Sequence, residues 1–303
     1  MKMGTTKFKV FYIRRRRVLK KKRCKVLSFL FAATICLAGA FFMFAHINNV
    51  SASSKEQNTS YNNDGENRDS EDISEQRFPA SYGRDIVKRR VSNDGKKIVF
   101  LTFDDGPSLK NTPKILDVLD KNAIKGTFFL IGKTVDQGGE YGSIVRRMYN
   151  EGHAICSHGY THSGKNLYPN GFVNVEHLLK EVEDTDNAIS KALGFQYKCK
   201  MFRFPYGEVT RIHNHDKNIK KAIDILDEHG ITSIDWNSLT EDSVGNKKSK
   251  QQLMNNLKKT SKGKDKIVVL LHDSEDIDDT ANMIQDIIDY FKSQAYSFGA
   301  FDI

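Results

Sequence analysis

The chain has 303 residues, of which 39% are hydrophobic and 28% are charged, and its formal net charge at pH 7 is +9. This length accommodates one large domain with accessory segments. The charge is uneven, because residues 1–25 hold 12 of the 47 Lys and Arg residues and no acid, which leaves 35 basic and 38 acidic residues elsewhere. The folded part is therefore not basic, and nucleic-acid binding is excluded as the expected function.

A membrane segment is the first element that the sequence predicts. The run Val26–Ala45 has twenty residues and no charge, which is about the length that a helix needs to cross a bilayer. The basic segment 1–25 precedes it, and because basic flanks stay in the cytoplasm, the rest of the chain is expected outside the cell on a single-pass anchor in the cell membrane. A cleaved signal peptide, with small residues at Val50–Ala52 as its cleavage site, is the alternative, and it would also export the chain.

Residues 46–94 are predicted to form a disordered spacer. The stretch from residue 51 to residue 76 is poor in apolar residues and rich in Ser, Asn, Asp and Glu. Such a composition buries too little apolar surface to offset the conformational entropy that folding removes. The folded domain is therefore expected to occupy residues 95–303.

From residue 95 onward, short apolar runs alternate with amphipathic stretches. Seven runs are predicted to be strands: Lys97–Phe103, Gly126–Ile131, His153–Ser157, Met201–Phe204, Thr232–Trp236, Lys266–Leu271 and Tyr296–Phe301. Six stretches have helical periodicity: Thr112–Asn122, Ser143–Glu151, Val175–Leu193, Ile219–Glu228, Lys250–Thr260 and Asp279–Gln294. This alternation indicates parallel strands joined by crossover helices. We predict an α/β fold, a (β/α) barrel of about seven parallel strands, with a doubly wound open sheet as the alternative.

Polar side chains follow the predicted strands at their carboxyl ends. In both architectures the functional groups of an enzyme stand at these ends. The residues found there are Asp104 and Asp105 after the first strand, His158 after the third, Arg203 to Tyr206 at the end of the fourth, Asp235 and Trp236 at the end of the fifth, and His272 after the sixth. We therefore expect one rim of the barrel to carry the chemistry.

The adjacent acids Asp104 and Asp105 need a partner of opposite charge, because like charges beside a buried strand repel and lose solvent. His158 and His162 are four residues apart, so both rings can lie on one face of a helical turn. Two imidazoles and one carboxylate form an open site for Zn²⁺ or a similar divalent ion, with a vacant position for water. One aspartate would then bind the ion, and the other would accept a proton from the water.

Two cysteines of the predicted domain, Cys156 and Cys199, lie on or beside different predicted strands. An exported domain permits a disulfide between them. Their geometry decides whether it forms, and two buried free thiols are the alternative.

Five stretches, "TFDDGP", "HGYTH", "RFPYG", "WNSLTED" and "LLH", occur in this order between residues 95 and 303. They resemble the five motifs of the polysaccharide deacetylase family, which is also known as the NodB-homology group or carbohydrate esterase family 4. The resemblance implies a distorted (β/α) barrel and metal-dependent removal of N- or O-acetyl groups from sugars. It also implies one divalent ion, Zn²⁺ first, with Co²⁺, Ni²⁺ or Mn²⁺ as alternatives.

The resemblance assigns the reacting groups position by position. Asp104 resembles the general base, and Asp105 resembles the carboxylate ligand of the metal. His158 and His162 resemble the two imidazole ligands. His272 resembles the general acid that protonates the leaving amine.

The resemblance also assigns supporting groups. Arg203 resembles the arginine that holds the catalytic carboxylate, and Asp242 falls where the family places the acid that orients the histidine. The backbone N–H of Tyr206, next to Pro205, would stabilise the oxyanion of the tetrahedral intermediate together with the metal. Trp236 is interpreted as a wall of the substrate groove.

The sequence departs from the family pattern in two motifs. Gly159 stands where the family has Ser or Thr, which removes a hydroxyl group that would brace the loop. Leu239 and Ser243 stand where many members have Asp and Trp, so one groove wall is expected to be lower. For this reason Asp235 is retained as the alternative to Asp242.

An exported deacetylase on a membrane tether is expected to act on cell-wall glycan, and N-acetylglucosamine residues of peptidoglycan are the favoured substrate. Alternatives are an exported poly-N-acetylglucosamine, chitin oligomers and acetylated xylan. A non-catalytic, membrane-anchored glycan-binding protein is the alternative from another functional class. That reading is disfavoured because the sequence carries both the metal ligands and the acid and base.

Overall fold

The computed structural model describes residues 77–302. The basic segment 1–25, the predicted membrane segment 26–45 and the part of the predicted spacer before residue 77 lie outside the described residues. Within residues 77–302, no helix has both the length and the apolar composition that crossing a bilayer requires.

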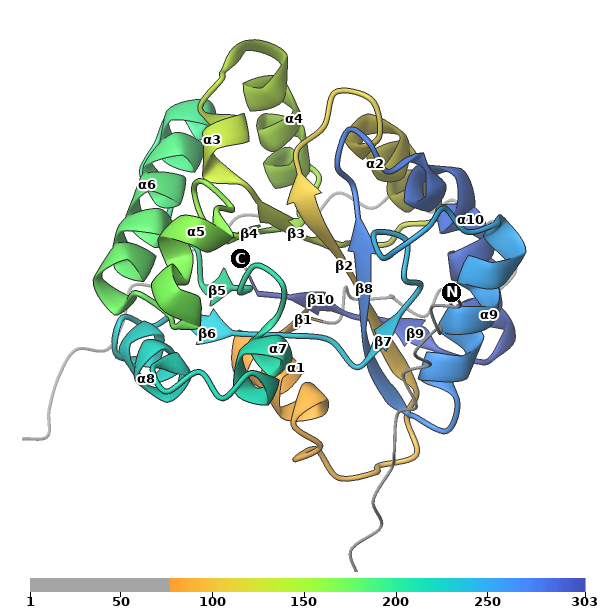
Figure 1. The fold of residues 1–303 in the computed structure, drawn as a ribbon. Coiled ribbons are helices and arrows are strands. Elements are labelled where there is room, and N and C mark those ends of the chain that lie inside the picture. Colours follow the sequence, from red (N-terminus) through yellow and green to blue (C-terminus); the bar gives the residue numbers. More distant parts are fainter. Residues whose placement is uncertain (1–76, 303) are drawn as a thin grey trace, which may run out of the picture. The chain divides into compact units, whose positions relative to one another are not determined.

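Parallel strands form the centre of the described residues (Figure 1). The main sheet has eight strands in the order β6-β5-β4-β3-β2-β8-β7, with β9 also paired to β2. These strands are β2 (Ile98–Gly106), β3 (Thr127–Leu130), β4 (Ala154–Ser157), β5 (Met201–Phe202), β6 (Thr232–Ser233), β7 (Ser238–Leu239), β8 (Lys266–His272) and β9 (Ser297–Phe298). Taken as a circle, this order follows the chain from β2 to β8. That is the order of a (β/α) barrel, and it lacks the reversal of a doubly wound sheet.

An irregular segment closes the barrel. β6 and β7 stand at the two ends of the strand order, and the residues between them cross from one edge to the other. The N–H of Ile234 donates to the carbonyl of Phe202 on β5 at 3.0 Å, and the N–H of Asn237 donates to the carbonyl of Val268 on β8 at 3.0 Å. The predicted barrel of parallel strands is therefore confirmed, and its distortion lies at this closure. The strand β7 was not predicted, and the predicted strand Tyr296–Phe301 is divided into β9 and a second short strand, Ala300–Phe301.

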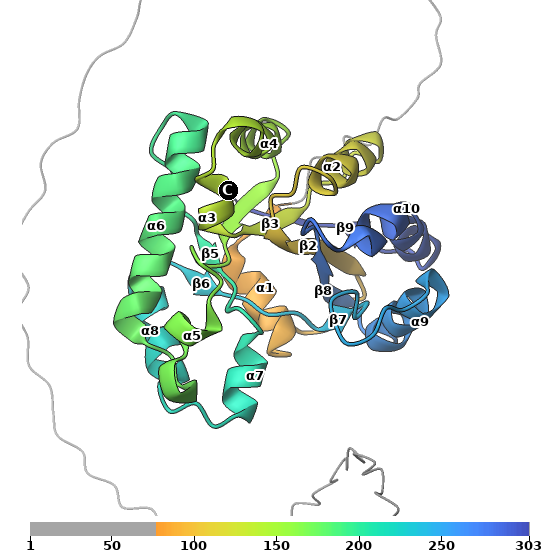
Figure 2. The ribbon, with the colours of Figure 1, turned by 45° about the horizontal axis from the view of Figure 1, so that its top comes forward.

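Helices surround the strands on the outside (Figure 2). The longer ones are α2 (Thr112–Lys121), α4 (Gly139–Asn150), α6 (Val175–Leu193), α8 (Ile219–Glu228), α9 (Lys250–Ser261) and α10 (Asp278–Ser293). The helix α1 (Ala80–Val87) instead packs against the cluster inside the barrel. Short helices are α3 (Gly132–Val135), α5 (Gly164–Leu167), α7 (Glu208–His213) and the 3₁₀ turn Pro169–Gly171. All six predicted helices are present with small differences at their ends, whereas α1 and the short helices were not predicted.

The two faces of β2 have different surroundings, because successive side chains of a strand point in opposite directions. Val99, Leu101 and Phe103 belong to the apolar cluster that includes buried residues of the surrounding helices. Phe100 belongs to a second cluster, which also contains residues of β3, β4, β5 and β8 and fills the barrel interior. Further along the same inner face, Thr102 binds the guanidinium of a buried arginine, so the interior changes from apolar to polar toward the carboxyl ends of the strands.

The apolar end of the barrel interior is closed by segments from both ends of the described chain. β1 (Arg77–Phe78) pairs with β10 (Ala300–Phe301). Arg77 also donates to the carbonyl of Gly152, which lies just before the start of β4. In α1, Ile86 is buried in the interior cluster. A Cβ on Gly83 would lie 2.4 Å from Ile234, so only glycine permits this close packing.

The prediction that residues 46–94 form a disordered spacer was therefore wrong for residues 77–87. Residues 77–87 form β1 and α1 and contribute Phe78, Tyr82 and Ile86 to the interior cluster or its edge. The prediction failed because these few apolar residues are diluted by a long polar sequence before them, so the average composition does not indicate folding. Their burial depends on a cavity that only the assembled barrel provides.

Cys156 and Cys199 are both buried free thiols. Cys156 belongs to the cluster inside the barrel, and Cys199 belongs to the cluster that packs against the helices. They therefore lie on opposite faces of the barrel wall, which explains why the alternative of two thiols holds and the disulfide does not form.

Candidate active site

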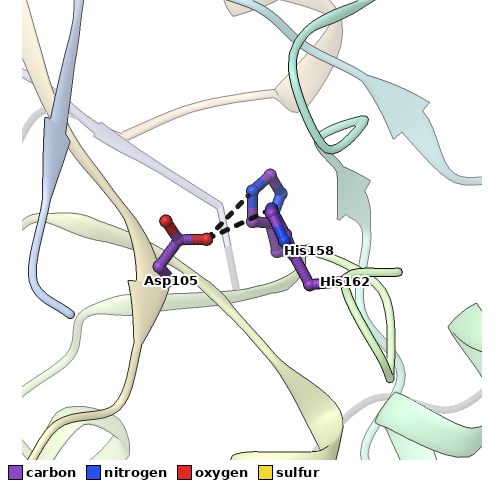
Figure 3. A group of neighbouring side chains, drawn as sticks. All are labelled: Asp105, His158 and His162. Atoms are coloured by element: carbon purple, nitrogen blue, oxygen red, sulfur yellow. Dashed lines mark ion pairs between the residues drawn. The ribbon is translucent and has the colours of Figure 1, made fainter. Parts of the chain in front are cut away.

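The first group of predicted residues meets at the carboxyl ends of β2 and β4. The Asp105 carboxylate lies 3.5 Å from Nε2 of His158 and 3.3 Å from Nε2 of His162 (Figure 3). One potential ligand atom from each of the three residues lies within 4.8 Å of the others. The spacing that the sequence predicted for a metal site is therefore present in the fold.

A bulge in β2 places both adjacent acids at the site. Asp104 pairs with Phe129 of β3 and Gly106 pairs with Leu130, so Asp105 is an extra residue between two regular pairs. In a regular strand, neighbouring side chains would point to opposite faces. Because a bulge redirects the side chain that it contains, Asp105 can face the histidines while Asp104 faces the barrel interior.

Backbone strain gathers at the same place. Asp105, His162 and Tyr206 have φ angles of 73°, 52° and 67°. L-amino acids other than glycine rarely adopt such values, and each costs of order 1–3 kcal/mol when the surroundings enforce it. Three such residues around one cluster indicate a geometry that the fold maintains at the expense of local stability.

The surroundings of His158 prepare its ring to bind a cation. Its Nδ1 lies 2.8 Å from the backbone carbonyl of Arg203, which accepts a hydrogen bond from it and leaves the lone pair of Nε2 directed at the cluster. Burial lowers the pKa of His158 to about 3, so the ring is neutral at ordinary pH. A neutral imidazole is the form that ligates metals.

A divalent ion fits the residues present. The Oδ1 atom of Asp105 is buried, and among the described residues it has no hydrogen-bond partner. A buried carboxylate oxygen that accepts no hydrogen bond is costly. A cation held by this oxygen and by the two imidazole nitrogens would remove that cost, and one carboxylate with two imidazoles is a donor set of open divalent-metal sites.

Asp104 lies against a fully buried guanidinium. Nη1 of Arg203 is 2.7 Å from Oδ1 of Asp104 and 2.8 Å from the hydroxyl oxygen of Thr102. The other donors of Arg203 reach the carbonyls of Ile234 at 3.0 Å and of Asp235 at 3.1 Å. Burial raises the pKa of Asp104, although Arg203 acts in the opposite direction. A raised pKa makes this carboxylate a better proton acceptor.

His272 and Asp242 form the second pair on the rim. His272 is the neighbour of Asp104 across the β2–β8 register. Its Nδ1 lies 2.9 Å from Oδ1 of Asp242, whose Oδ2 accepts hydrogen bonds from the His272 N–H at 2.9 Å and from the Thr280 hydroxyl at 2.6 Å. Burial alone would lower the pKa of His272, but the Asp242 carboxylate raises it to about 9.

The acid beside His272 is therefore Asp242, and Asp235 has a different environment. The Asp235 carboxylate accepts hydrogen bonds from the backbone N–H groups of Glu208 at 2.9 Å and Val209 at 2.8 Å. These are the first two residues of α7, so Asp235 holds the start of that helix. The replacement of a family Asp by Leu239 does not disturb the His272–Asp242 contact.

The remaining predicted residues are Pro205, Tyr206 and Trp236, and they lie in or beside the loop between β5 and α7. Tyr206 is exposed, and its ring centroid lies 5.3 Å from that of His162. The Pro205 carbonyl accepts a hydrogen bond from the Tyr168 hydroxyl at 2.8 Å. Trp236 lies under the backbone of the same loop, because a Cβ on Gly207 would approach it to 2.7 Å. Trp236 thus supports the loop that carries Tyr206.

The sequence analysis did not predict the contacts of two residues near the site, Glu181 and Ser243. The carboxylate of Glu181 on α6 accepts hydrogen bonds from both the N–H and the hydroxyl of Thr161, each at 2.6 Å. It therefore braces the loop that the hydroxyl missing at Gly159 was expected to hold. Ser243 places its hydroxyl oxygen 3.2 Å from Nε2 of His272. A charged residue between apolar positions of a helix was the available signal for Glu181, and no sequence signal marks the contact of Ser243.

Comparisons with known proteins give a consistent result. A profile described as "Polysaccharide deacetylase" matches residues 91–234. The chain is 35% identical over 152 residues to a peptidoglycan-N-acetylglucosamine deacetylase of Bacillus cereus, an alignment that covers 50% of this chain and 50% of that protein. The chain thus spans about half the length of that relative. It is also 27% identical over 280 residues to the putative polysaccharide deacetylase YheN of Bacillus subtilis, covering 91% of this chain and 92% of that protein.

Solved structures agree with the sequence matches. The structure of a Streptococcus mutans CE4 esterase superposes with a TM-score of 0.66 at 30% sequence identity. The superposition covers 75% of this chain and 92% of that one. The similarity therefore includes nearly the whole of that domain.

Proposed function

The chain belongs to the polysaccharide deacetylase family, and on that premise we propose that it is a metal-dependent hydrolase that removes N-acetyl groups from N-acetylglucosamine residues of cell-wall peptidoglycan. One observation carries the proposal: the Asp105–His158–His162 cluster lies on the same rim as the Asp104–Arg203 pair and the His272–Asp242 pair. Hydrolysis of an amide needs a base, an acid and an electrophilic centre, and this rim offers a candidate for each.

Asp105, His158 and His162 are proposed to hold the ion. A divalent ion, with Zn²⁺ as the first candidate, supplies polarisation of the acetamide carbonyl and lowers the pKa of water to about 7. The residues around it bind and move protons. The N–H of Tyr206 is proposed to donate a hydrogen bond to the oxygen of the carbonyl as negative charge develops on it.

The atoms proposed to accept and to donate protons are those that the hydrogen bonds to Arg203 and Asp242 leave available. Oδ1 of Asp104 is paired with Arg203, so Oδ2, which lies 3.8 Å from Nε2 of His158, is the atom proposed to take a proton from the attacking water. Nδ1 of His272 is engaged by Asp242, so Nε2, which also lies 3.2 Å from the Ser243 hydroxyl oxygen, is the atom proposed to give a proton to the leaving nitrogen. Oxygen adds to the acyl carbon, the C–N bond breaks, and acetate and a free amine result.

The substrate class rests on similarity and on the expected location. The Bacillus cereus relative is named a peptidoglycan-N-acetylglucosamine deacetylase. A membrane anchor at residues 26–45, or a signal segment in its place, would bring the domain to the cell wall. Poly-N-acetylglucosamine, chitin oligomers and acetylated xylan are the alternative substrates.

Acetate release by the full-length chain tests the proposal. The detergent-solubilised protein is incubated with peptidoglycan, chitin oligomers and acetylated xylan, before and after removal of metal by a chelator. We expect acetate from peptidoglycan, its loss after chelation and its return with added Zn²⁺. Full activity without any metal would refute the mechanism, and glycan binding without acetate release would identify a non-catalytic glycan-binding protein.

A further inference from the structure

Most exposed large apolar side chains of residues 77–302 lie on the same rim as the candidate active site. Among residues 77–302 there are six: Leu109, Phe195, Tyr206, Val209, Ile212 and Val244. All except Phe195 lie in segments that follow the carboxyl ends of β2, β5 or β7, which is the rim that carries the site. Three of them, Tyr206, Val209 and Ile212, lie within seven residues of one another, on or just before α7.

The helix α7 has the reverse of the usual amphipathic pattern. A surface helix normally buries its apolar residues and exposes its charged ones. In α7 the acid Glu208 is only 4% exposed, whereas Val209 is 61% exposed and Ile212 is 53% exposed. The fold thus presents the apolar side chains to solvent and buries a carboxylate instead.

Buried polar contacts hold α7 in this orientation. The Asp235 carboxylate binds the N–H groups of Glu208 and Val209. The Glu208 carboxylate accepts a hydrogen bond from the Ser233 hydroxyl at 3.1 Å and lies 3.3 Å from Nζ of Lys88. These contacts fix the orientation of α7, and they therefore keep Val209 and Ile212 exposed.

One member of this apolar group lies beside the candidate active site. Tyr206 is the first of its three members, and its ring lies beside His162 of the metal-binding cluster. Arg203, which holds Asp104, also donates to the carbonyl of Asp235, the residue that positions α7. A ligand that reaches the cluster would thus extend over Val209 and Ile212 if it continues in this direction.

We infer that Tyr206, Val209 and Ile212 form a platform for a sugar ring of the glycan chain that neighbours the ring being deacetylated. This inference rests on the proposed function and adds a specificity-determining surface to it. Side chains three residues apart on a helix are roughly 5–6 Å apart at Cβ, which suits the apolar face of one sugar ring. A second copy of the chain is a poor occupant, because a stable interface needs about 800 Å² from each partner and three side chains supply far less.

A substrate-length series tests the platform in the full-length chain. The double variant Val209→Ser/Ile212→Ser removes apolar surface at exposed positions, where substitutions rarely affect folding. We expect KM for chitin hexamer to rise roughly 3- to 10-fold, with kcat and the activity on chitobiose unchanged. The conservative variant Val209→Ile/Ile212→Leu should keep the wild-type KM. Phe195→Ser is the matched control, since Phe195 is 45% exposed away from the rim and should alter neither substrate.

Three outcomes would overturn the inference. The first is an equal loss on dimer and hexamer, which would show a structural role, and the second is no loss on either. The third is a loss that appears in proteoliposomes and not in detergent, which would identify a lipid surface as the occupant. If the wild-type chain binds glycans without releasing acetate, the proposed function fails, and the affinities of the same variants for dimer and hexamer, measured by calorimetry, still decide the platform.

Discussion

The two ends of the barrel interior differ in what they bury. At the end closed by α1 and β10, Phe100 stacks on Phe301 with ring centroids 4.4 Å apart, and the cluster around them is apolar. At the other end, the interior holds Arg203, Asp104 and His158, all nearly inaccessible to solvent. The Arg203 guanidinium carbon lies 4.1 Å from the ring centroid of Phe129, so the boundary between the apolar and the polar end lies between these two side chains.

The difference shows which part of the core stabilises the fold and which part serves the chemistry. Apolar burial is favourable wherever it occurs. Buried charges lose hydration and are tolerated only when each has partners, and an apolar replacement of similar volume is often as stable. The polar end of the barrel is therefore expected to contribute function at some expense of stability. Four substitutions test that division.

The largest effect on turnover is expected at the polar end, from Asp104→Asn. The amide keeps the size of the carboxylate but accepts no proton, so kcat should fall by about 10²–10⁴-fold, measured by acetate release. The metal content, measured by elemental analysis, should stay unchanged, because Asp105, His158 and His162 remain. Asp120→Asn, on an exposed face of α2, is the control. A variant with wild-type kcat would remove Asp104 as the base.

The largest effect on stability is expected at the apolar end, from Phe100→Ala. Removal of a fully buried phenyl ring should lower the free energy of unfolding by about 3–5 kcal/mol, measured by chemical denaturation. The kcat per folded molecule should not change, because the ring of Phe100 packs against Phe78, Tyr82 and Phe301 at the opposite end of the barrel. A drop in kcat without a drop in stability would contradict the division between the two ends.

A smaller and pH-dependent effect is expected from Asp242→Asn. The Asp242 carboxylate raises the pKa of His272 to about 9, and without it the pKa should return toward about 6.5. At pH 8 the general acid would then be protonated roughly thirtyfold less often. The alkaline limb of the profile of kcat/KM against pH should move to lower pH, whereas Glu241→Gln should leave it in place.

The same pair also contributes to stability in a predictable direction. Because the pKa of His272 is higher in the folded state, its protonated form stabilises the fold fully below about pH 6.5, and this contribution is lost as the pH rises through about 9. Denaturation of the wild-type chain and of Asp242→Asn should therefore differ most at mildly acidic pH, where Asp242 is ionised and His272 is protonated, and the difference should shrink as the pH rises through about 9. A constant difference at all pH values would exclude the proposed coupling.

The smallest effect is expected from Glu181→Gln. The amide can accept one of the two hydrogen bonds from Thr161 but loses the charge that strengthens both. The loop that carries His162 should hold its ring less firmly, and the dissociation constant for Zn²⁺ should rise about tenfold. Glu183→Gln, two residues away on the exposed side of α6, should bind Zn²⁺ as the wild type does. Equal affinity in both variants would show that the brace does not matter.

Much of the fold could be predicted because its signals are local. The mainly apolar run at the start of β2 and the helical periodicity of α6 each indicate their structure within one segment. The residues of the site could be located because parallel barrels place their functional groups at strand ends. The family resemblance favoured Asp242 but left Asp235 as the alternative, and the contact of Asp242 with His272 decides between them.

The rest depends on contacts between distant segments. The bulge at Asp105 exists only in the register of β2 against β3, and α1 is ordered only against the assembled barrel. Glu181 is 20 residues away from the loop that it braces. The exposed apolar side chains of α7 likewise depend on Asp235, which is more than 20 residues away in the sequence. No window of the sequence contains both partners of these contacts.

The position of Arg77 has a consequence for how the protein can be attached and engineered. The chain enters the domain beside Gly152, at the amino ends of the strands, whereas the reacting groups stand at the carboxyl ends. A nine-residue strand such as β2 spans about 30 Å between these ends. Arg77 and the reacting groups thus lie at opposite ends of the strands. A fusion partner joined before residue 77 should therefore leave turnover on soluble oligomers unchanged.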